Sequence, residues 1–319
     1  LFKPKNSRDK LDSYIDQLAH NECKLNGHNI SLDVSFGVST GKNSNIYRLA
    51  HVALKEAKQT HKKIIFLNGG IGLENKINNN IDIINAIQSA IKDDRVTPYF
   101  QGIVDNKTKK IVKYEALIRL IKRNGEVLSP FFFLEASKKA KSYQELTRIM
   151  IAKAFNVFKN CEYGFSINLT LSDMRSKNTM DVLYENLEKY GCGDRLILEI
   201  VESEGIEYFE EVCLFIKEVK KYGCRIAIDD FGSGYSNFAY LAKLDIDFIK
   251  IDGSLIHDID KDENKRIAVE SILYFAKHKG IKTIAEYIET QSIFDLMLEL
   301  GVDYSQGYLF SKPQAMLLK

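Results

Sequence analysis

A recurring order of helix, glycine and short strand constrains what this chain can fold into. Four amphipathic segments each close at a glycine and precede a short strand-like run: 181–191 before 196–200, 209–223 before 226–228, 267–280 before 283–285, and 293–301 before 304–307. Glycine after a helix adopts the left-handed conformation that ends many helices, and near-continuous apolar strands are typical of parallel sheets buried on both faces. The pattern predicts an α/β domain with parallel strands, and a barrel fits the length.

Composition allows a large enzyme and says little about its partner. The chain has 319 residues, of which 45% are hydrophobic and 28% charged, with a formal net charge of +2. This length suits one barrel-sized domain plus a smaller unit. Near-neutral charge gives no signal for binding to a nucleic-acid polymer.

The five cysteines are scattered without a C-x-x-C pair, which indicates neither a disulfide framework nor a zinc site. The default expectation is therefore the reducing cytoplasm. We expect no membrane span, because no stretch approaches about 18 unbroken apolar residues, and no signal peptide. Because the chain begins at Leu1 without an initiator Met, we expect a piece of a longer protein that could carry an upstream sensor or membrane anchor.

The chain is predicted to divide near residues 70 to 85. Glycines at 69, 70 and 72 and a run of three asparagines at 78–80 precede a helical pattern at 81–91. We expect a small subdomain at 1–70, a linker with the start of a connecting helix at 71–82, and the barrel at 83–319.

Polar residues recur at the ends of the predicted strands. They are Glu115, Arg119, Asn168, Glu199, Glu202, Asp229, Asp230, Lys250, Asp252, Glu286, Glu289 and Gln306. The carboxyl ends of parallel strands are where a (β/α)₈ barrel builds its active site. These side chains converge only if the barrel closes.

Asp229 and Asp230 are adjacent carboxylates that end an apolar strand and open a glycine-hinged loop. Two buried charges need compensation, and a divalent cation would supply it. Carboxylates with a side-chain amide, and without histidine or cysteine, are hard donors suited to Mg²⁺ or Mn²⁺. Two such ions about 3.5–4 Å apart would support hydrolysis of a phosphodiester. The residues alone do not separate this reaction from other two-metal barrel hydrolyses.

Seven motifs follow one another in an order that resembles the EAL family of bacterial cyclic-di-GMP phosphodiesterases. They are Glu115-Ala-Leu-Ile-Arg, Ile167-Asn-Leu, Glu199-Ile-Val-Glu-Ser, Asp229-Asp-Phe-Gly-Ser-Gly-Tyr-Ser, Phe248-Ile-Lys-Ile-Asp, Ala285-Glu and Gln306-Gly-Tyr-Leu-Phe. The resemblance covers roughly residues 83 to 318. It implies a TIM-like barrel with one antiparallel strand and hydrolysis of cyclic-di-GMP to linear 5′-pGpG.

The resemblance also implies roles for individual residues. A first metal would be held by Glu115, Asn168, Glu199 and Asp229, and a second by Asp229, Asp230 and Glu286. Catalytic roles fall to Lys250, Glu115, Glu202 and Glu289, with Lys250 contacting the attacking water and Glu202 bracing the loop from Phe231. Substrate would contact Gln101, Leu117, Arg119, Asp252 and Gln306.

Physical reasoning refines two of these roles. Arg119 can bind a phosphate through two parallel hydrogen bonds, because its guanidinium group is planar. Lys250, among carboxylates, should stay protonated, which argues against its acting as a general base. It would instead orient the water or stabilise charge in the transition state.

Three positions depart from the family pattern. Gly102 stands where proline is usual and is expected to loosen the start of its strand, altering how Gln101 is held. Tyr287 replaces a glycine beside Glu286 and could crowd the backbone there or displace a nearby loop. Asp245 stands where proline is common and is expected on the surface.

The first seventy residues resemble a different family. Segments 29–39, 46–58 and 62–67 are similar to the carboxyl-terminal half of a GGDEF diguanylate-cyclase domain, but the Gly-Gly-Asp-Glu-Phe signature is absent. We expect a degenerate remnant without cyclase activity that packs on the linker helix. Regulation through the linker is the weaker alternative.

The main rival to catalysis is a receptor for cyclic-di-GMP, or a protein-interaction module that ignores nucleotide. Loss of metal ligands would signal such a change, and here the ligands are intact. Calcium is expected to inhibit, because its longer and looser coordination would disturb a two-metal geometry. On resemblance, we expect a homodimer through the barrel near the Phe231 loop.

Overall fold

The computed structural model describes residues 22–25, 28–31, 36–40, 50, 53–54, 64–68, 72–202, 208–233 and 238–318. The chain divides into two compact units, Leu1–Asp82 and Ile83–Lys319. None of the helices in the described ranges combines the length and apolar character that a bilayer crossing requires.

The first unit contains two short strand pairs. Strands β1 (Glu22–Leu25) and β2 (His28–Ser31) are antiparallel, whereas β3 (Phe36–Thr40) and β4 (Ile64–Asn68) are parallel. Most of segment 46–58, on which the GGDEF resemblance partly rests, lies outside the described residues. That resemblance therefore stays a prediction.

The second unit is built on a closed ring of eight strands. Its strands run in the order β5-β13-β12-β11-β10-β9-β8-β6, and β6 pairs back with β5 to close the ring, while β7 extends β6 as a hairpin. The strands are β5 (Val96–Asp105), β6 (Lys110–Ile121), β7 (Val127–Leu128), β8 (Gly164–Asn168), β9 (Leu196–Val201), β10 (Arg225–Phe231), β11 (Phe248–Ile251), β12 (Lys282–Ala285) and β13 (Tyr304–Gln306).

Within this ring β5 runs against both of its neighbours. It is antiparallel to β6 and to β13, whereas the other ring pairs are parallel. The predicted TIM-like barrel with one antiparallel strand is confirmed.

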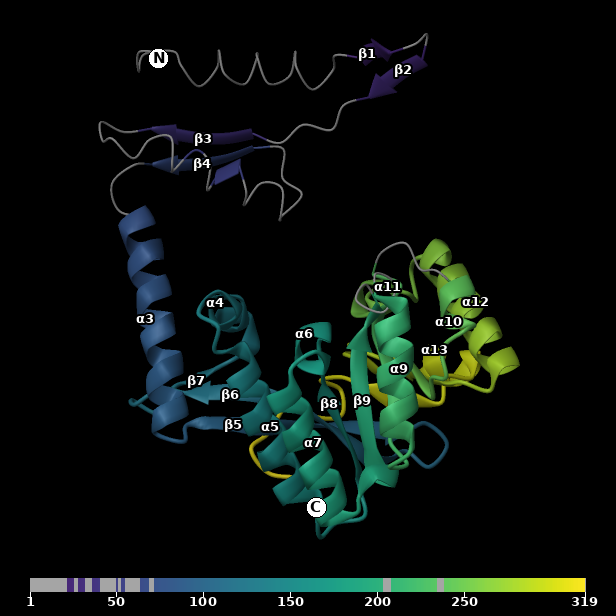
Figure 1. Ribbon diagram of the computed structural model, residues 1–319. Helices are drawn as coiled ribbons and strands as arrows, with labels where there is room; N and C mark the ends of the chain where they lie inside the picture. The colour runs from purple at the N-terminus through teal and green to yellow at the C-terminus, as the bar shows by residue number, and fades with distance from the viewer. Residues whose placement is uncertain are drawn as a thin grey trace. The chain divides into compact units, whose positions relative to one another are not determined.

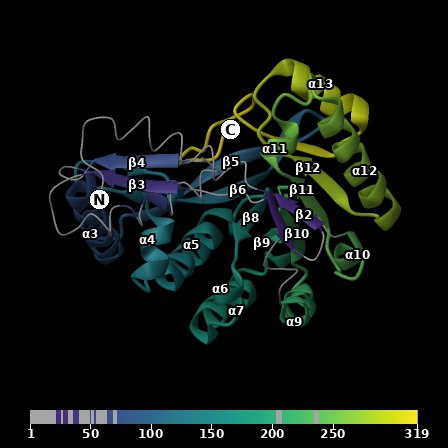
Figure 2. The ribbon, with the colours of Figure 1, turned by 90° about the horizontal axis from the view of Figure 1, so that it is seen from above.

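Helices lie on the outside of this ring (Figures 1 and 2). They are α4 (Leu134–Lys139), α5 (Tyr143–Phe158), α6 (Leu171–Met174), α7 (Lys177–Tyr190), α9 (Phe209–Lys220), α10 (Phe238–Leu241), α11 (Gly253–Ile256), α12 (Glu263–Lys279) and α13 (Gln291–Leu300). A further helix, α3 (Gly72–Lys92), spans the boundary between the two units. Two 3₁₀ turns, η1 (Pro130–Phe132) and η2 (Gly193–Arg195), complete the described elements.

Helix ends follow from local sequence. Gly191, Gly280 and Gly301 end α7, α12 and α13 in the left-handed conformation, as the pattern predicts. The fourth prediction is wrong, because α9 ends at Lys220, before Gly223. Asp262 and Thr290 cap the starts of α12 and α13 with side-chain oxygens, so these helices begin slightly earlier than the apolar periodicity alone indicates.

The described core residues form three clusters, one of which packs α3 against β6 through Ile87, Ala90 and Leu120. Apolar side chains between the ring and the helices form the larger cluster. A smaller cluster fills the inside of the ring with Ile103, Ile197, Ala227, Phe248 and Ile284. Because the barrel interior is packed, polar side chains gather where this filling ends, at the carboxyl ends of the parallel strands.

Candidate active site

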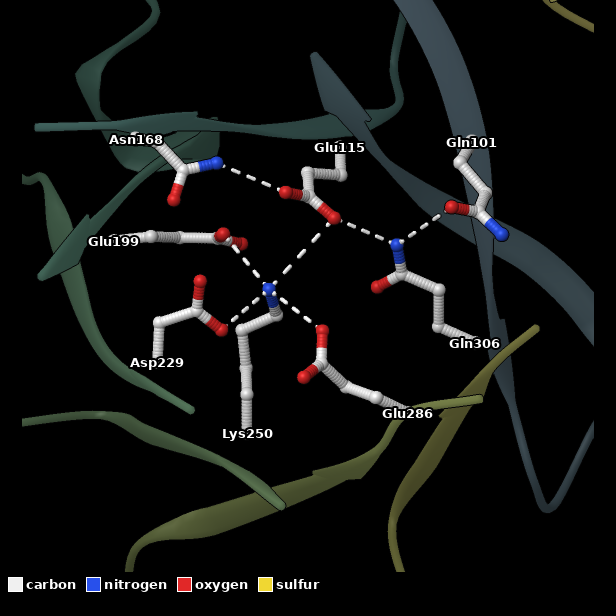
Figure 3. Close-up of polar contacts among 8 residues, drawn as sticks. All are labelled: Gln101, Glu115, Asn168, Glu199, Asp229, Lys250, Glu286 and Gln306. Carbon is white, nitrogen blue, oxygen red and sulfur yellow. Dashed lines mark hydrogen bonds and ion pairs between the residues drawn. The ribbon is translucent and has the colours of Figure 1, made fainter. Parts of the chain in front are cut away.

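A buried lysine is at the centre of the site. Lys250, on β11, is 1% exposed. Its Nζ lies 2.8 Å from Asp229 Oδ1, 2.9 Å from Glu199 Oε2, 3.0 Å from Glu286 Oε1 and 3.7 Å from Glu115 Oε2. Figure 3 shows the ammonium group between these carboxylates, which come from four other strands or strand ends. Barrel closure thus brings together residues that are far apart in the chain.

Glu115 links the lysine to a row of amides (Figure 3). Asn168 Nδ2 donates to Glu115 Oε1 at 2.9 Å, and Gln306 Nε2 donates to Glu115 Oε2 at 2.7 Å. Gln306 Nε2 also donates to Gln101 Oε1 at 3.3 Å. Two donors fix the orientation of the Glu115 carboxylate. The prediction that Glu115 ends its strand is wrong, because β6 continues to Ile121 and pairs there with β7.

A second acidic group adjoins the lysine. Asp229, Asp230 and Glu286 each offer a carboxylate oxygen, and these oxygens lie within 4.8 Å of one another. Asp230 has a φ of 55°, which turns the chain at the end of β10. Among the described residues, the buried Glu199 Oε1 has no hydrogen-bond partner. A buried acceptor without a donor beside clustered carboxylates fits the binding of divalent cations.

Protonation of the cluster follows from burial and charge. Burial raises the pKa of Glu199 well above its usual range and that of Glu286 to about 8. Burial, then the neighbouring Asp229, raises the pKa of Asp230 to about 6. Burial would lower the pKa of Lys250, but the surrounding carboxylates outweigh it and raise this pKa well above its usual value. Lys250 is therefore charged at neutral pH.

A cavity of about 310 Å³ opens above this cluster. Its walls include the predicted residues Gln101, Glu115, Leu117, Arg119, Asp229, Asp230, Lys250, Glu286, Glu289 and Gln306, together with Tyr287, Gly307, Tyr308 and Pro313. Arg119 is half-buried, with Nη1 donating to the carbonyl of Ile118. The lining of the cavity therefore combines the guanidinium group of Arg119 with side-chain amides and carboxylates.

Four predicted residues lie outside the cavity lining: Asn168, Glu199, Glu202 and Asp252. Asn168 and Glu199 contact lining residues, as described above. Glu202 Oε2 accepts from the backbone N–H of Gly232 at 3.2 Å, which ties the end of β9 to the turn after β10. Asp252 caps α11 by accepting from the N–H of Ser254. Most of the loop after Gly232 lies outside the described residues.

The expectation that Gly102 loosens the start of its strand is wrong, whereas its effect on how Gln101 is held stays a prediction. Gly102 lies inside β5 and not at its start, and a Cβ there would approach Ile111 Cδ1 to 2.7 Å. Its N–H donates to Ser311 Oγ, while Gln101 Nε2 donates to the Ser311 carbonyl. The glycine thus permits close packing of Ile111, and Gln101 is held by a residue 210 positions away.

The other two departures have clear locations. Asp245 is exposed, as expected, and pairs with Lys220 at 3.1 Å. Tyr287 has a φ of 54°, lines the cavity and packs against Gly253.

Sequence reasoning missed Ser311 and Tyr308. Tyr308 belongs to the Gln306-Gly-Tyr-Leu-Phe motif, so its place beside Gln306 was a usable signal. Ser311 carries no motif of its own, and its contact with Gln101 depends on how the chain folds back after β13.

Residues 84–313 match the family described as "EAL domain". Over 244 residues, covering 75% of this chain and 36% of the relative, the chain is 34% identical to "Cyclic di-GMP phosphodiesterase PdeA" from Borreliella burgdorferi. It is 30% identical over 255 residues to "Cyclic di-GMP phosphodiesterase PdeF" from Escherichia coli, covering 78% of this chain and 34% of that protein.

Among solved structures, the "Klebsiella pneumoniae BlrP1 pH 8.0 calcium/cy-diGMP complex" is 29% identical with a TM-score of 0.61. The match covers 69% of this chain and 56% of that one. The chain spans about a third of the length of the two curated relatives.

Proposed function

The chain belongs to the EAL domain family, and we propose that it hydrolyses cyclic-di-GMP to linear 5′-pGpG with divalent cations. The main observation behind this proposal is the buried Lys250 ammonium, which lies within 3.7 Å of four carboxylates at the base of a polar cavity. The names of the two relatives support the same substrate.

We infer that Mg²⁺ or Mn²⁺ occupies two positions. Glu115, Asn168, Glu199 and Asp229 would hold one ion, and Asp229, Asp230 and Glu286 the other. The clustered oxygens of the second set and the donor-free Glu199 Oε1 support this assignment. When bound, the ions would activate water and offset negative charge on the phosphodiester oxygens.

Lys250 acts in this proposal as a hydrogen-bond donor. The surrounding carboxylates raise its pKa, which favours the protonated ammonium and therefore the role of a donor. It can orient the water and stabilise charge that develops on a phosphoryl oxygen. Glu202 positions the turn at Gly232, and Glu289 and Asp252 are assigned to the edge of the site.

The cavity walls would hold the dinucleotide. The Arg119 guanidinium offers several N–H donors in one plane, which suits a phosphate. Gln101 and Gln306 present amides from adjacent strands, and Leu117 supplies an apolar wall.

The test is incubation of the chain with cyclic-di-GMP and Mn²⁺ or Mg²⁺, followed by separation of 5′-pGpG. We expect linear product with either ion and a marked loss of product when Ca²⁺ replaces it. A Glu199→Gln variant is the matched control, because it removes one ligand charge while keeping the size of the side chain. Binding without product would instead assign a receptor, and no binding a protein-interaction module.

We also propose that the chain is a homodimer through the barrel near the Phe231 loop, that it works in the cytoplasm, and that residues 1–70 are a degenerate GGDEF-like remnant. The first rests on family resemblance and the second on the free cysteines at 161, 192, 213 and 224, which suit a reducing compartment. Sedimentation of the full chain at several concentrations tests the dimer.

A further inference from the structure

We propose that Tyr287 is a substrate-binding residue on the rim of the cavity, where its ring stacks on a planar nucleobase of the dinucleotide. The inference rests on the proposed function and assigns a binding contact that the family pattern, with glycine at this position, would lack.

The backbone conformation of Tyr287 indicates a functional role for its side chain. Its φ of 54° lies in the left-handed region, which is unfavourable for a bulky residue with a Cβ and natural for glycine. Asp230, the other left-handed residue in this cavity wall, has a short polar side chain that tolerates the conformation better. Strain of this kind beside a functional cavity is the observation from which a role can be inferred.

The ring of Tyr287 is held in place from one side. A Cβ built on Gly253, the first residue of α11, would lie 2.2 Å from Tyr287 Cδ2 and 2.6 Å from its Cγ. The ring thus lies directly on the backbone of Gly253, which is itself buried. Any side chain at position 253 would push the ring away.

The rest of the ring remains open. Tyr287 is 64% exposed while lining the cavity, and Tyr308, 58% exposed, lines the same cavity from the segment after β13. A large aromatic surface that is fixed in position yet exposed costs little conformational entropy when it binds a ligand.

A purine base matches this surface. Every base has a planar π-face, and stacking on an aromatic ring does not depend on the base's hydrogen-bonding edge. Glu286, directly before Tyr287, belongs to the carboxylate cluster. The ring therefore stands where the base of a dinucleotide whose phosphate reaches that cluster would extend toward the rim.

The experiment uses the full chain and cyclic-di-GMP. We measure KM and kcat with Mn²⁺, and the dissociation constant with Ca²⁺, for Tyr287→Ala, Tyr287→Phe and Gly253→Ala. Tyr274→Ala is the control, because Tyr274 is 69% exposed on α12 and does not line the cavity. We expect Tyr287→Ala to raise KM and the dissociation constant about tenfold, the size of one lost stack, with little change in kcat. Tyr287→Phe keeps the aromatic ring, so its KM and dissociation constant should stay below those of Tyr287→Ala, whereas Tyr274→Ala should match the wild type.

Gly253→Ala distinguishes stacking from a general effect on the rim. It should weaken binding in the wild-type background, because it displaces the ring, and have little further effect when Tyr287 is already alanine. Unchanged affinity in Tyr287→Ala, or a fall in kcat at constant KM, would overturn the stacking role while leaving hydrolysis intact. A wild-type chain that neither binds nor hydrolyses cyclic-di-GMP would overturn both proposals.

Discussion

Lys250 shows how one buried charge organises the site. An ammonium that is 1% exposed is favourable only because carboxylates surround it, and they in turn are buried because it offsets their charge. Removing one member of such a group leaves the others uncompensated.

Lys250→Met, which keeps the apolar volume, should lose both activity and stability. We expect turnover to fall about 10²–10³-fold, as for loss of one donor to the transition state, while metal and substrate still bind. In EDTA, urea denaturation should show a loss of about 3–5 kcal/mol in the free energy of unfolding. Mn²⁺ should restore part of this loss by binding the folded carboxylates.

Lys177→Met is the control for that measurement. Lys177 pairs with Asp181 at 2.6 Å on an exposed helix face, and such a solvent-exposed pair contributes little to stability. Wild-type turnover in Lys250→Met would defeat the catalytic assignment, and equal stability losses in the two variants would defeat the structural one.

Lys113 is a second buried lysine, away from the cavity. It is 7% exposed, and its Nζ lies 3.4 Å from the centroid of the Tyr304 ring. Burial, then repulsion from Arg225, lowers its pKa from 10.5 to about 8. A lowered lysine pKa means that the charged form destabilises the folded state relative to the unfolded state.

Lys113→Met should therefore show a pH-dependent gain in stability. Between pH 8 and 10.5 the unfolded chain holds a proton that the folded chain has released, so wild-type stability rises with pH in this window. We expect the variant to be more stable by up to about 3 kcal/mol at pH 7, with the advantage shrinking towards pH 10.5. Denaturation at pH 7, 9 and 10.5 measures it. A pH-independent difference would show that packing, and not charge, controls stability here.

At the scale of elements, two glycines close together in the chain are required for different reasons. Gly191 ends α7 with a φ of 60° and has open space around it, whereas a Cβ on Gly193 would lie 2.0 Å from the carbonyl oxygen of Tyr222. The first is needed for its backbone angle and the second for close packing of two chain segments.

Substitution by alanine should separate these reasons. Gly191→Ala is expected to cost about 1 kcal/mol from backbone strain alone. Gly193→Ala should cost more, about 1–3 kcal/mol beyond propensity, because backbone atoms must shift. Thermal unfolding of both variants gives the order, and a larger loss for Gly191→Ala would contradict it.

At the scale of the whole molecule, the core of the barrel unit includes residues of helix α3. Ile87 and Ala90 of α3 are buried in a cluster with Leu120 and Phe133. The described apolar contacts of α3 thus belong to the unit that begins at Ile83.

Deletion of residues 1–75 should therefore leave turnover of cyclic-di-GMP within about twofold of the full chain, as expected for a unit with its own core. A parallel deletion of residues 1–92 removes the packing of α3 and should reduce soluble, folded protein. A large change in turnover for the shorter deletion would instead indicate that the first unit regulates the barrel.

Local sequence determined the helices, the strands and the side chains at the strand ends. Apolar periodicity and terminal glycines such as Gly280 depend on neighbours in the chain, and so does the expectation that Asp229 and Glu286 end strands. Family resemblance added the antiparallel strand, which the pairing of β5 confirms.

Tertiary structure decided what barrel closure brings together. The packing of Ile111 over Gly102, the Ser311 contact of Gln101 and the ring of Tyr287 on Gly253 join segments whose separation in the chain carries no periodic signal. The burial of Lys250 and of Lys113 belongs to the same class. A charged residue has the same appearance in a sequence whether it faces water or a ring of carboxylates, and only packing sets its solvation and therefore its energy.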